Sequence, residues 1–347
     1  MVLALHSLTQ RGVITGLTAL TLVSFVTFLL QQYRPVDPIT AWEHFGERDV
    51  VRSLYYIPPL GLGTWQIPKS KTAEVVQFAL ENGYRHLDAA LIYGNEKEVG
   101  EGIAAAQVPR SSLWVTGKLW NNAHRPSEVR PALKQTLRDL GLDYLDLYLM
   151  HWPIAFEPGS IYNTVIDPHT SLRQTWAAME DLVREGLVRQ IGISNFNQAQ
   201  AEQILLHAAI PPTVHEFECH LYLQQTEFVK WNLERGLRVI AFSPLGNMNQ
   251  IYNSSHTPLL EDDSLVRYAK GKGLTVAQLA LAWNMHRGVV VIPKSEHVAR
   301  VAENFHAQSV HLTREDMVNL QRIDEKQRFN NPSTEWGVHL YSGLDGA

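Results

Sequence analysis

The chain has 347 residues, of which 45% are hydrophobic and 19% are charged, so it carries enough apolar residues to bury a large core. Its net charge of −5 leaves no broad basic surface, which excludes nucleic acid as an expected partner and favours a small-molecule ligand. The single cysteine, Cys219, excludes an internal disulfide and a paired-cysteine metal site, and it suits a reducing compartment.

The first 35 residues differ in composition from the rest of the chain. Residues 13–30 carry no charge, and as a helix they would span about 27 Å, close to the thickness of the hydrocarbon core of a bilayer. Residues 29–32 lack the small side chains of a signal-peptide cleavage site. We therefore expect residues 1–35 to hold an uncleaved single-pass anchor, with a cleaved or targeting segment and a misassigned start as alternatives. Residues 36–55 are expected to form a linker.

From residue 56 onward, short apolar runs alternate with stretches of helical period. The apolar runs, which predict strands, are 60–64, 84–88, 113–118, 145–151, 189–194, 213–216, 238–243 and 289–294. The amphipathic stretches, which predict helices, are 72–82, 96–106, 126–140, 172–185, 198–207, 224–235, 275–287 and 298–306.

The ends of the predicted helices carry capping signals. Thr170, Asn197 and Thr275 stand where N-caps belong. Glycines stand just past the predicted helix ends, at positions 83, 141, 186, 236 and 288.

Eight alternating units predict an α/β fold with parallel pairing, and specifically a single (β/α)8 TIM barrel over residues 56–327, followed by a C-terminal substrate loop at 328–347. An open doubly wound sheet is the alternative. It usually carries a G-x-G-x-x-G loop after its first strand, and residues 61–65 do not match that pattern.

Polar residues close most of the predicted strands. Because barrel active sites lie at the carboxyl ends of the strands, we expect these side chains to gather on one rim. Each has an ordinary alternative explanation, as a cap, a solvated strand end or a core residue, but the full set favours a site. The residues are Asp88, Lys118, His151, Ser194, Glu216, Ser243 and Lys294.

Six stretches of the chain together resemble the aldo-keto reductase family. They read GYRHLDAALIYGNEKEVG at 83–100, TGKLW at 116–120, LGLDYLDLYLMHWP at 140–153, IGISNF at 191–196, FSPLG at 242–246 and IPKS at 292–295. The resemblance covers about residues 60–324. It implies a nicotinamide dinucleotide cofactor bound without a Rossmann domain. It also implies a catalytic tetrad of Asp88, Tyr93, Lys118 and His151.

Carbonyl reduction explains why these residue types are needed. A hydride must reach the carbonyl carbon while a proton reaches the oxygen, and Tyr93 would donate that proton. We expect the Lys118 ammonium to lower the pKa of Tyr93 toward the working range, and Asp88 to keep the buried lysine charged. His151 would hydrogen-bond the carbonyl oxygen and orient it.

The resemblance also implies cofactor contacts. Glu216 replaces the glutamine, and Phe242 the stacking tyrosine, that many members have, so we expect weaker tuning of nicotinamide binding. Basic groups near a helix start favour NADPH (NADP+) over NADH, although the acidic Glu296 leaves NADH use open. The implied cofactor residues are Thr64, Trp65, Asp88, Ser194, Asn195, Glu216, Phe242, Ser243, Leu245, Lys294, Ser295, Arg300 and Asn304.

The substrate is expected to be an aldehyde or ketone, with small aldehydes, sugars, keto esters and bulkier ketones as the alternatives. The apolar walls of its pocket would come from Trp65, Trp120 and Trp152, with His151 beside them. The long insert at 244–263 and the tail at 328–347 would close over this pocket.

These features predict an NADPH-dependent carbonyl reductase of the NADP+ alcohol dehydrogenase type. The alternative is a redox-sensing module of the same fold that serves a membrane partner, as potassium-channel β-subunits of this family do. The reduced cofactor and the free Cys219 place the barrel on the cytosolic side of the expected membrane anchor. If the N-terminal segment is misassigned, the protein is expected to be soluble and cytoplasmic.

Overall fold

The computed structural model describes residues 56–246 and 255–347. The predicted N-terminal segment 1–35, with its anchor at 13–30, and the linker 36–55 lie outside the described residues. Part of the predicted insert 244–263 also lies outside them. All the described residues belong to one compact unit.

We predicted a single-pass membrane protein with its barrel facing the cytosol, and this prediction is wrong for the chain as described. Across residues 56–246 and 255–347, no helix is both long and apolar enough to cross a membrane.

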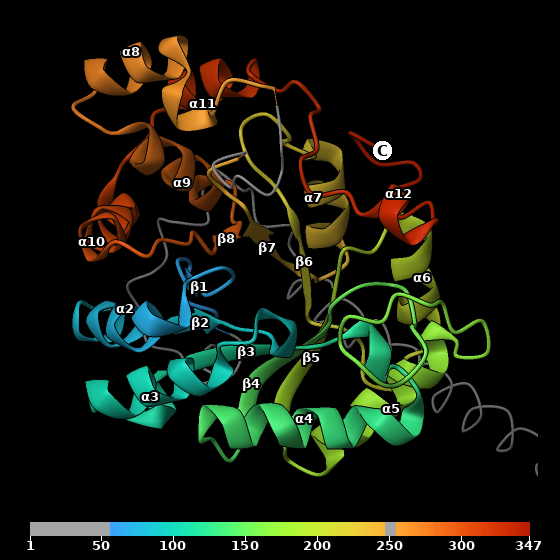
Figure 1. The fold of residues 1–347 in the computed structure, drawn as a ribbon. Coiled ribbons are helices and arrows are strands. Elements are labelled where there is room, and N and C mark those ends of the chain that lie inside the picture. Colours follow the sequence, from blue (N-terminus) through green and yellow to red (C-terminus); the bar gives the residue numbers. More distant parts are fainter. Residues whose placement is uncertain (1–55, 247–254) are drawn as a thin grey trace, which may run out of the picture. The chain divides into compact units, whose positions relative to one another are not determined.

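Eight parallel strands form one sheet in which each strand pairs with the next along the chain (Figure 1). Hydrogen bonds also join the start of the sheet to its last strand: Gly61 N donates to Val291 O at 2.8 Å, and Val291 N donates to Pro59 O at 2.9 Å. The fold is therefore a barrel-like α/β fold with all eight predicted strands. The strands are β1 (Leu62–Gly63), β2 (His86–Asp88), β3 (Trp114–Leu119), β4 (Leu145–Met150), β5 (Val188–Ser194), β6 (Val214–Glu218), β7 (Arg238–Phe242) and β8 (Val290–Val291).

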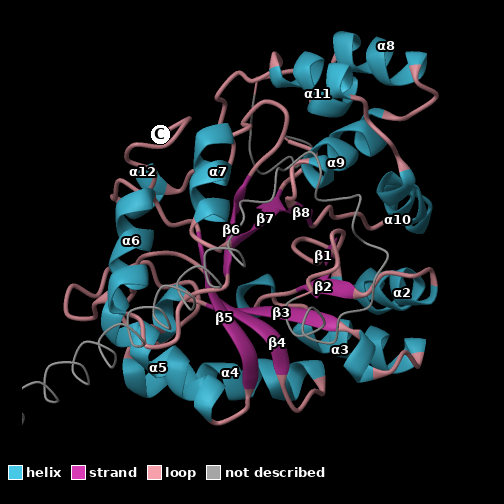
Figure 2. Cartoon of the chain, turned by 180° about the vertical axis from the view of Figure 1, so that it is seen from behind, coloured by secondary structure: helices cyan, strands magenta, loops and turns pink. Residues whose placement is uncertain are grey.

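Helices surround the strands on the outside (Figure 2). The eight predicted helices are α2 (Lys69–Glu81), α3 (Glu96–Ala106), α4 (Pro126–Leu140), α5 (Leu172–Arg184), α6 (Gln198–His207), α7 (Thr226–Glu234), α9 (Val276–His286) and α10 (Val298–Phe305). Short 3-10 helices are η2 (Leu91–Tyr93), η3 (Arg110–Ser112), η4 (Asn121–Ala123), η6 (Leu259–Glu261) and η7 (His306–Ser309).

The sequence did not predict three further helices: α8 (Asp263–Gly271), α11 (Arg314–Gln321) and α12 (Ser333–Trp336). Helix α12 has only four residues, which is too few to show a helical period. The start of α8 is fixed by Asp262, whose side chain accepts hydrogen bonds from the backbone N–H groups of Ser264 and Leu265. Helices α8 and α11 lie together at one end of the fold (Figure 1).

The capping signals are confirmed in two of three cases. Asn197 and Thr275 each form a capping box at the start of their helices. Thr170 is not the N-cap of α5. Ser171 is, because its hydroxyl accepts from Gln174 N at 3.3 Å, whereas the Thr170 hydroxyl donates to Asp167.

Alternation along the strands decides which side chains enter the barrel. Trp114 of β3 and Val214 of β6 belong to one apolar cluster that packs across strands β3 to β8. Since side chains alternate along a strand, Lys118 and Glu216, four and two residues further on, point to the same interior at its carboxyl end. The barrel interior is therefore apolar below and charged at the rim.

Candidate active site

Buried Lys118 is the centre of the charged group at the rim. Its side chain is 0% exposed. Its amine donates to Asp88 Oδ1 at the end of β2 and to Ala89 O at 3.2 Å, and it lies 3.5 Å from Glu216 Oε1 on β6. Strands β2, β3 and β6 thus bring one cation and two carboxyl groups together in the barrel interior.

Opposite charges keep Lys118 protonated. Burial acts to lower the pKa of its amine, but the Asp88 carboxylate, with smaller contributions from Glu216 and Tyr93, outweighs burial and raises that pKa above its usual value. Burial raises the pKa of Asp88, while the charge of Lys118 opposes the rise. Lys118 is therefore a fixed positive charge in the site, held by the carboxylate that the sequence indicated.

Tyr93 lies on the short helix η2 that follows β2. Gly94, with φ 72°, ends η2 in the left-handed region that favours glycine, and the buried Asn95 fixes the loop by donating to Thr64 O at 2.9 Å. The Lys118 amine lies 5.1 Å from the centroid of the Tyr93 ring. Tyr93 follows Asp88 by five residues, and Lys118 lies on the next strand. The tyrosine and the lysine therefore meet at the rim.

The electrostatic effect on Tyr93 differs from the expected one. We predicted that Lys118 would lower the pKa of Tyr93 toward the working range. Lys118 does lower the pKa of this phenol, but burial raises the same pKa by more than Lys118 lowers it. Asp88 and Glu216 add to the rise. Tyr93 consequently holds its proton at neutral pH.

His151 follows β4 and faces the same space. Its ring lies edge-on to the Tyr93 ring, with 5.8 Å between the centroids. Burial lowers the pKa of His151 well below its usual value, and the nearby charge of Lys118 adds to this effect. The imidazole is therefore neutral at physiological pH and carries one N–H that can donate to an oxygen atom.

Aromatic side chains surround His151 and Tyr93. The ring centroid of Trp120 lies 5.2 Å from that of His151, Trp152 stacks on His151 at 6.3 Å, and Trp65 lies 6.4 Å from Tyr93. All three predicted wall residues thus lie beside the candidate tetrad.

The C-terminal tail adds further aromatic contacts to this wall. The Trp336 ring contacts Trp152 at 4.9 Å and Phe156 at 5.2 Å between centroids. Tail residues Leu340 and Tyr341 belong to the same buried cluster. Phe156 was not predicted from the sequence, because it lies in the loop after β4, outside any strand end or motif.

The residues expected at the nicotinamide end lie at the ends of β5 and β7 and, for Glu216, in the middle of β6, which extends to Glu218. Asn195 donates from its amide to His151 O at 3.0 Å and to Ser194 Oγ at 3.1 Å, and its Oδ1 accepts from the Tyr341 hydroxyl at 3.4 Å. Glu216 pairs with Ser194 in the register of β5 and β6. These contacts connect the tail, the tetrad and the expected cofactor residues.

Other residues that were expected to contact the cofactor lie on several elements. Thr64 donates from its hydroxyl to Asp88 O at 2.8 Å, so this side chain supports the end of β2. Phe242 ends β7, and Ser243 follows with φ 46°. The Leu245 side chain instead packs against the apolar cluster between α8 and α9, so only its backbone is left for the predicted contact.

The residues expected at the adenosine end surround the start of α10. Lys294 and Arg300 are exposed, whereas Asn304 is buried on α10. Ser295 accepts from His297 N at 3.0 Å, which fixes the turn before the helix. The acidic Glu296 lies 3.8 Å from Lys71.

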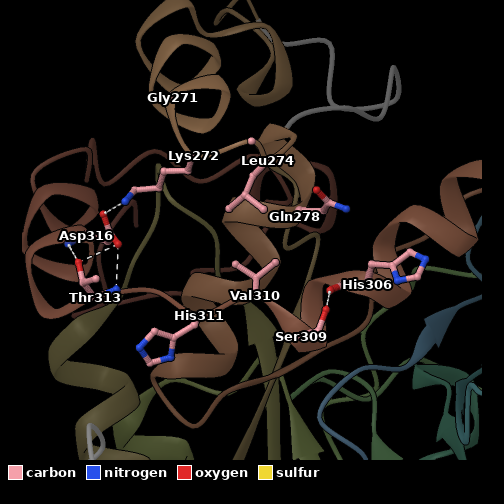
Figure 3. Close-up of a pocket in the computed structure, with 11 residues that line it drawn as sticks. Gly271, Lys272, Leu274, Gln278, His306, Ser309, Val310, His311, Thr313 and Asp316 are labelled. Atoms are coloured by element: carbon pink, nitrogen blue, oxygen red, sulfur yellow. Dashed lines mark hydrogen bonds and ion pairs between the residues drawn. The ribbon is translucent and has the colours of Figure 1, made fainter.

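A separate hollow lies between α8, α9 and α11, lined by residues that include Lys272, His311 and Asp316 (Figure 3). Lys272 forms an ion pair with Asp316 at 2.5 Å there. None of the predicted site residues lines this hollow, so it is not the candidate active site.

The described residues thus form an α/β barrel with a tyrosine, a charged lysine and a neutral histidine at its carboxyl rim. Comparison with known proteins gives the family. Residues 59–325 match the model of the aldo/keto reductase family. The chain belongs to this family.

Individual relatives agree with this assignment. The chain is 46% identical to an uncharacterized oxidoreductase of Schizosaccharomyces pombe, over 83% of this chain and 92% of that protein. It is 41% identical to human aldo-keto reductase family 1 member A1, over 80% of this chain and 89% of that protein. The structure of an aldose reductase from Giardia lamblia superposes with a TM-score of 0.78 at 36% identity, covering 83% of this chain and 99% of that chain.

Proposed function

We propose that this protein reduces an aldehyde or ketone with NADPH and that Tyr93 donates the proton. Family membership implies carbonyl reduction, and one observation supports the role of Tyr93. At the carboxyl end of the barrel, the centroid of its ring lies 5.1 Å from the buried Lys118 amine and 5.8 Å from the centroid of the neutral His151 ring.

The side chains of His151 and Tyr93 would act on the carbonyl oxygen, and Lys118 and Asp88 would support Tyr93. The His151 N–H orients the oxygen, and the Tyr93 hydroxyl, which keeps its proton at neutral pH, donates to it as negative charge develops. The Lys118 charge stabilises the phenolate that forms, and Asp88 holds the lysine in place. The bound cofactor would supply the hydride.

The residues present are suitable for a nicotinamide dinucleotide. At the rim, Glu216 Oε2 receives no hydrogen bond from any described residue, so it can accept one from a carboxamide NH₂. At the start of α10, exposed Lys294 and Arg300 can bind a phosphate. Trp65, Trp120 and Trp152 would form the apolar wall against the substrate.

The N-terminal segment, which mildly favoured the alternative of a redox-sensing module, lies outside the described residues. We therefore propose the enzyme alone. The test is multiple-turnover oxidation of NADPH by a panel of aldehydes and ketones, measured by the loss of nicotinamide absorbance. Turnover of at least one carbonyl compound is expected, and binding of NADPH without turnover of any would contradict the proposal.

Lys294→Ala and Arg300→Ala are expected to raise the KM for NADPH about tenfold or more and to change the KM for NADH much less. Each substitution removes a charge-assisted hydrogen bond to the extra phosphate, which only NADPH carries. Steady-state kinetics with both cofactors would test this. Lys230→Ala, which removes an exposed lysine on α7, is the control. Equal effects on both cofactors would contradict the NADPH preference.

A further inference from the structure

Glu216 gives the buried lysine a second carboxyl partner. Lys118 donates to Asp88 Oδ1 and lies 3.5 Å from Glu216 Oε1. The other oxygens, Asp88 Oδ2 and Glu216 Oε2, receive no donor from the residues at 56–246 and 255–347. Both carboxyl groups therefore face the same buried lysine. Two carboxyl groups that share one cation repel each other when both are ionised, so the arrangement is favourable only when one of them carries a proton.

The charges around Glu216 favour a proton on this residue. The titratable groups that face it are Asp88 from β2, Lys118 from β3 and Tyr93 from η2. Its neighbours in register on β5 and β7 are Ser194 and Ile240, which carry no charge. Burial, and then the negative charge of Asp88, raise the pKa of Glu216 well above its usual value against the opposing effect of Lys118.

A proton on Glu216 balances the charges of the site. With Asp88 ionised and Glu216 neutral, the single charge of Lys118 is matched by a single negative charge. When Glu216 loses its proton, the rim gains one negative charge that no described cation compensates. This added charge lies 3.5 Å from the lysine, whose amine is 5.1 Å from the centroid of the Tyr93 ring.

We propose that Glu216 holds this proton in the resting site, and that its ionisation makes the site bind oxidised nicotinamide in preference to reduced nicotinamide. The inference rests on the proposed function. A hydride donor has to contact the carbonyl carbon whose oxygen lies at Tyr93 and His151, which places the nicotinamide beside this rim. The oxidised ring carries a positive charge and the reduced ring carries none, so only the oxidised ring gains from an anionic Glu216.

The test measures the dissociation constants of NADP+ and NADPH on the full chain from about pH 6 to about pH 9, by quenching of tryptophan fluorescence. The adenosine phosphates are the same in both cofactors, so their titration cancels in the ratio of the two constants. In the wild type, the preference for NADP+ over NADPH is expected to grow about tenfold across this range. This change corresponds to a pKa of Glu216 that is about one unit lower in the NADP+ complex than in the NADPH complex.

Glu216→Gln and Glu216→Met remove the ionisable group at nearly constant size, so the ratio is expected to stay flat with pH in both variants. Glu218→Gln is the matched control on the same strand. Its buried carboxylate already accepts from Phe329 N at 2.9 Å and Asn330 N at 3.0 Å, so this variant is expected to keep the wild-type pH dependence.

The possible failures can be told apart. If the Glu216 variants bind both cofactors with the wild-type pH dependence, Glu216 is not the group responsible and the inference is wrong. If Glu218→Gln flattens the ratio as well, the pH dependence of the ratio is not caused by Glu216 at the rim, which also overturns the inference. If the wild type binds neither cofactor, the proposed function itself fails.

Discussion

Tyr93→Phe is expected to lower kcat for carbonyl reduction by about 10² to 10⁴, the range that a positioned proton donor contributes. The substitution removes one hydroxyl and keeps the ring that contacts His151 and Trp65. NADPH binding is therefore expected to stay near its wild-type value. Turnover with a responsive aldehyde and cofactor binding by fluorescence would be measured on the same preparation.

Tyr84→Phe is the matched control for this substitution. It also removes the hydroxyl of a buried tyrosine, one that donates to Val301 O at 2.9 Å on the outer helix α10. Near-normal turnover is expected from the Tyr84 variant. Wild-type turnover in the Tyr93 variant would show that another group donates the proton.

Lys118→Met is expected to remove most of the activity and also to destabilise the fold by about 3–5 kcal/mol at neutral pH, as occurs when one partner of a buried ion pair is removed. Asp88 and Glu216 would remain in the interior without their cation. The phenolate that forms on Tyr93 would also lose the charge that stabilises it. Turnover and urea unfolding would be measured on the variant.

The pH dependence of stability gives this variant a distinct signature. Burial already raises the pKa of Asp88 and Glu216, and without Lys118 no cation among the described residues would oppose that rise. A group whose folded pKa is raised contributes most below its unfolded pKa, and that contribution is lost as the pH rises through the folded value. The variant should therefore be most stable in acid and lose stability as the pH rises.

Lys272→Met serves as the control, because it removes a lysine that is ion-paired with Asp316 outside the candidate site. It is expected to retain activity and to lack the acid-favoured stability. If Lys118→Met keeps full activity and a wild-type stability profile, Lys118 is only the polar end of a strand.

Local patterns in the sequence were sufficient for most of the architecture. Short apolar runs predicted all eight strands, and helical repeats predicted the eight helices that follow them, because each element buries its own apolar residues. They also indicated that Asp88, Lys118 and His151 end neighbouring strands. Parallel strands bring such ends to one rim, so the gathering of these side chains could be inferred without coordinates.

The tertiary structure decided what the local pattern could not. Strands β3 and β6 are not neighbours in the sheet, so no spacing along the chain indicates that Lys118 and Glu216 meet across the barrel interior. The direction in which the pKa of Tyr93 is shifted depended on the same contact, because that shift is a balance between burial, one cation and two carboxyl groups. The sequence by itself determined the eight strands, the eight helices that alternate with them and the residues at the rim. Only the folded barrel decided which charges face one another there, because contacts across its interior join residues that are far apart in the chain.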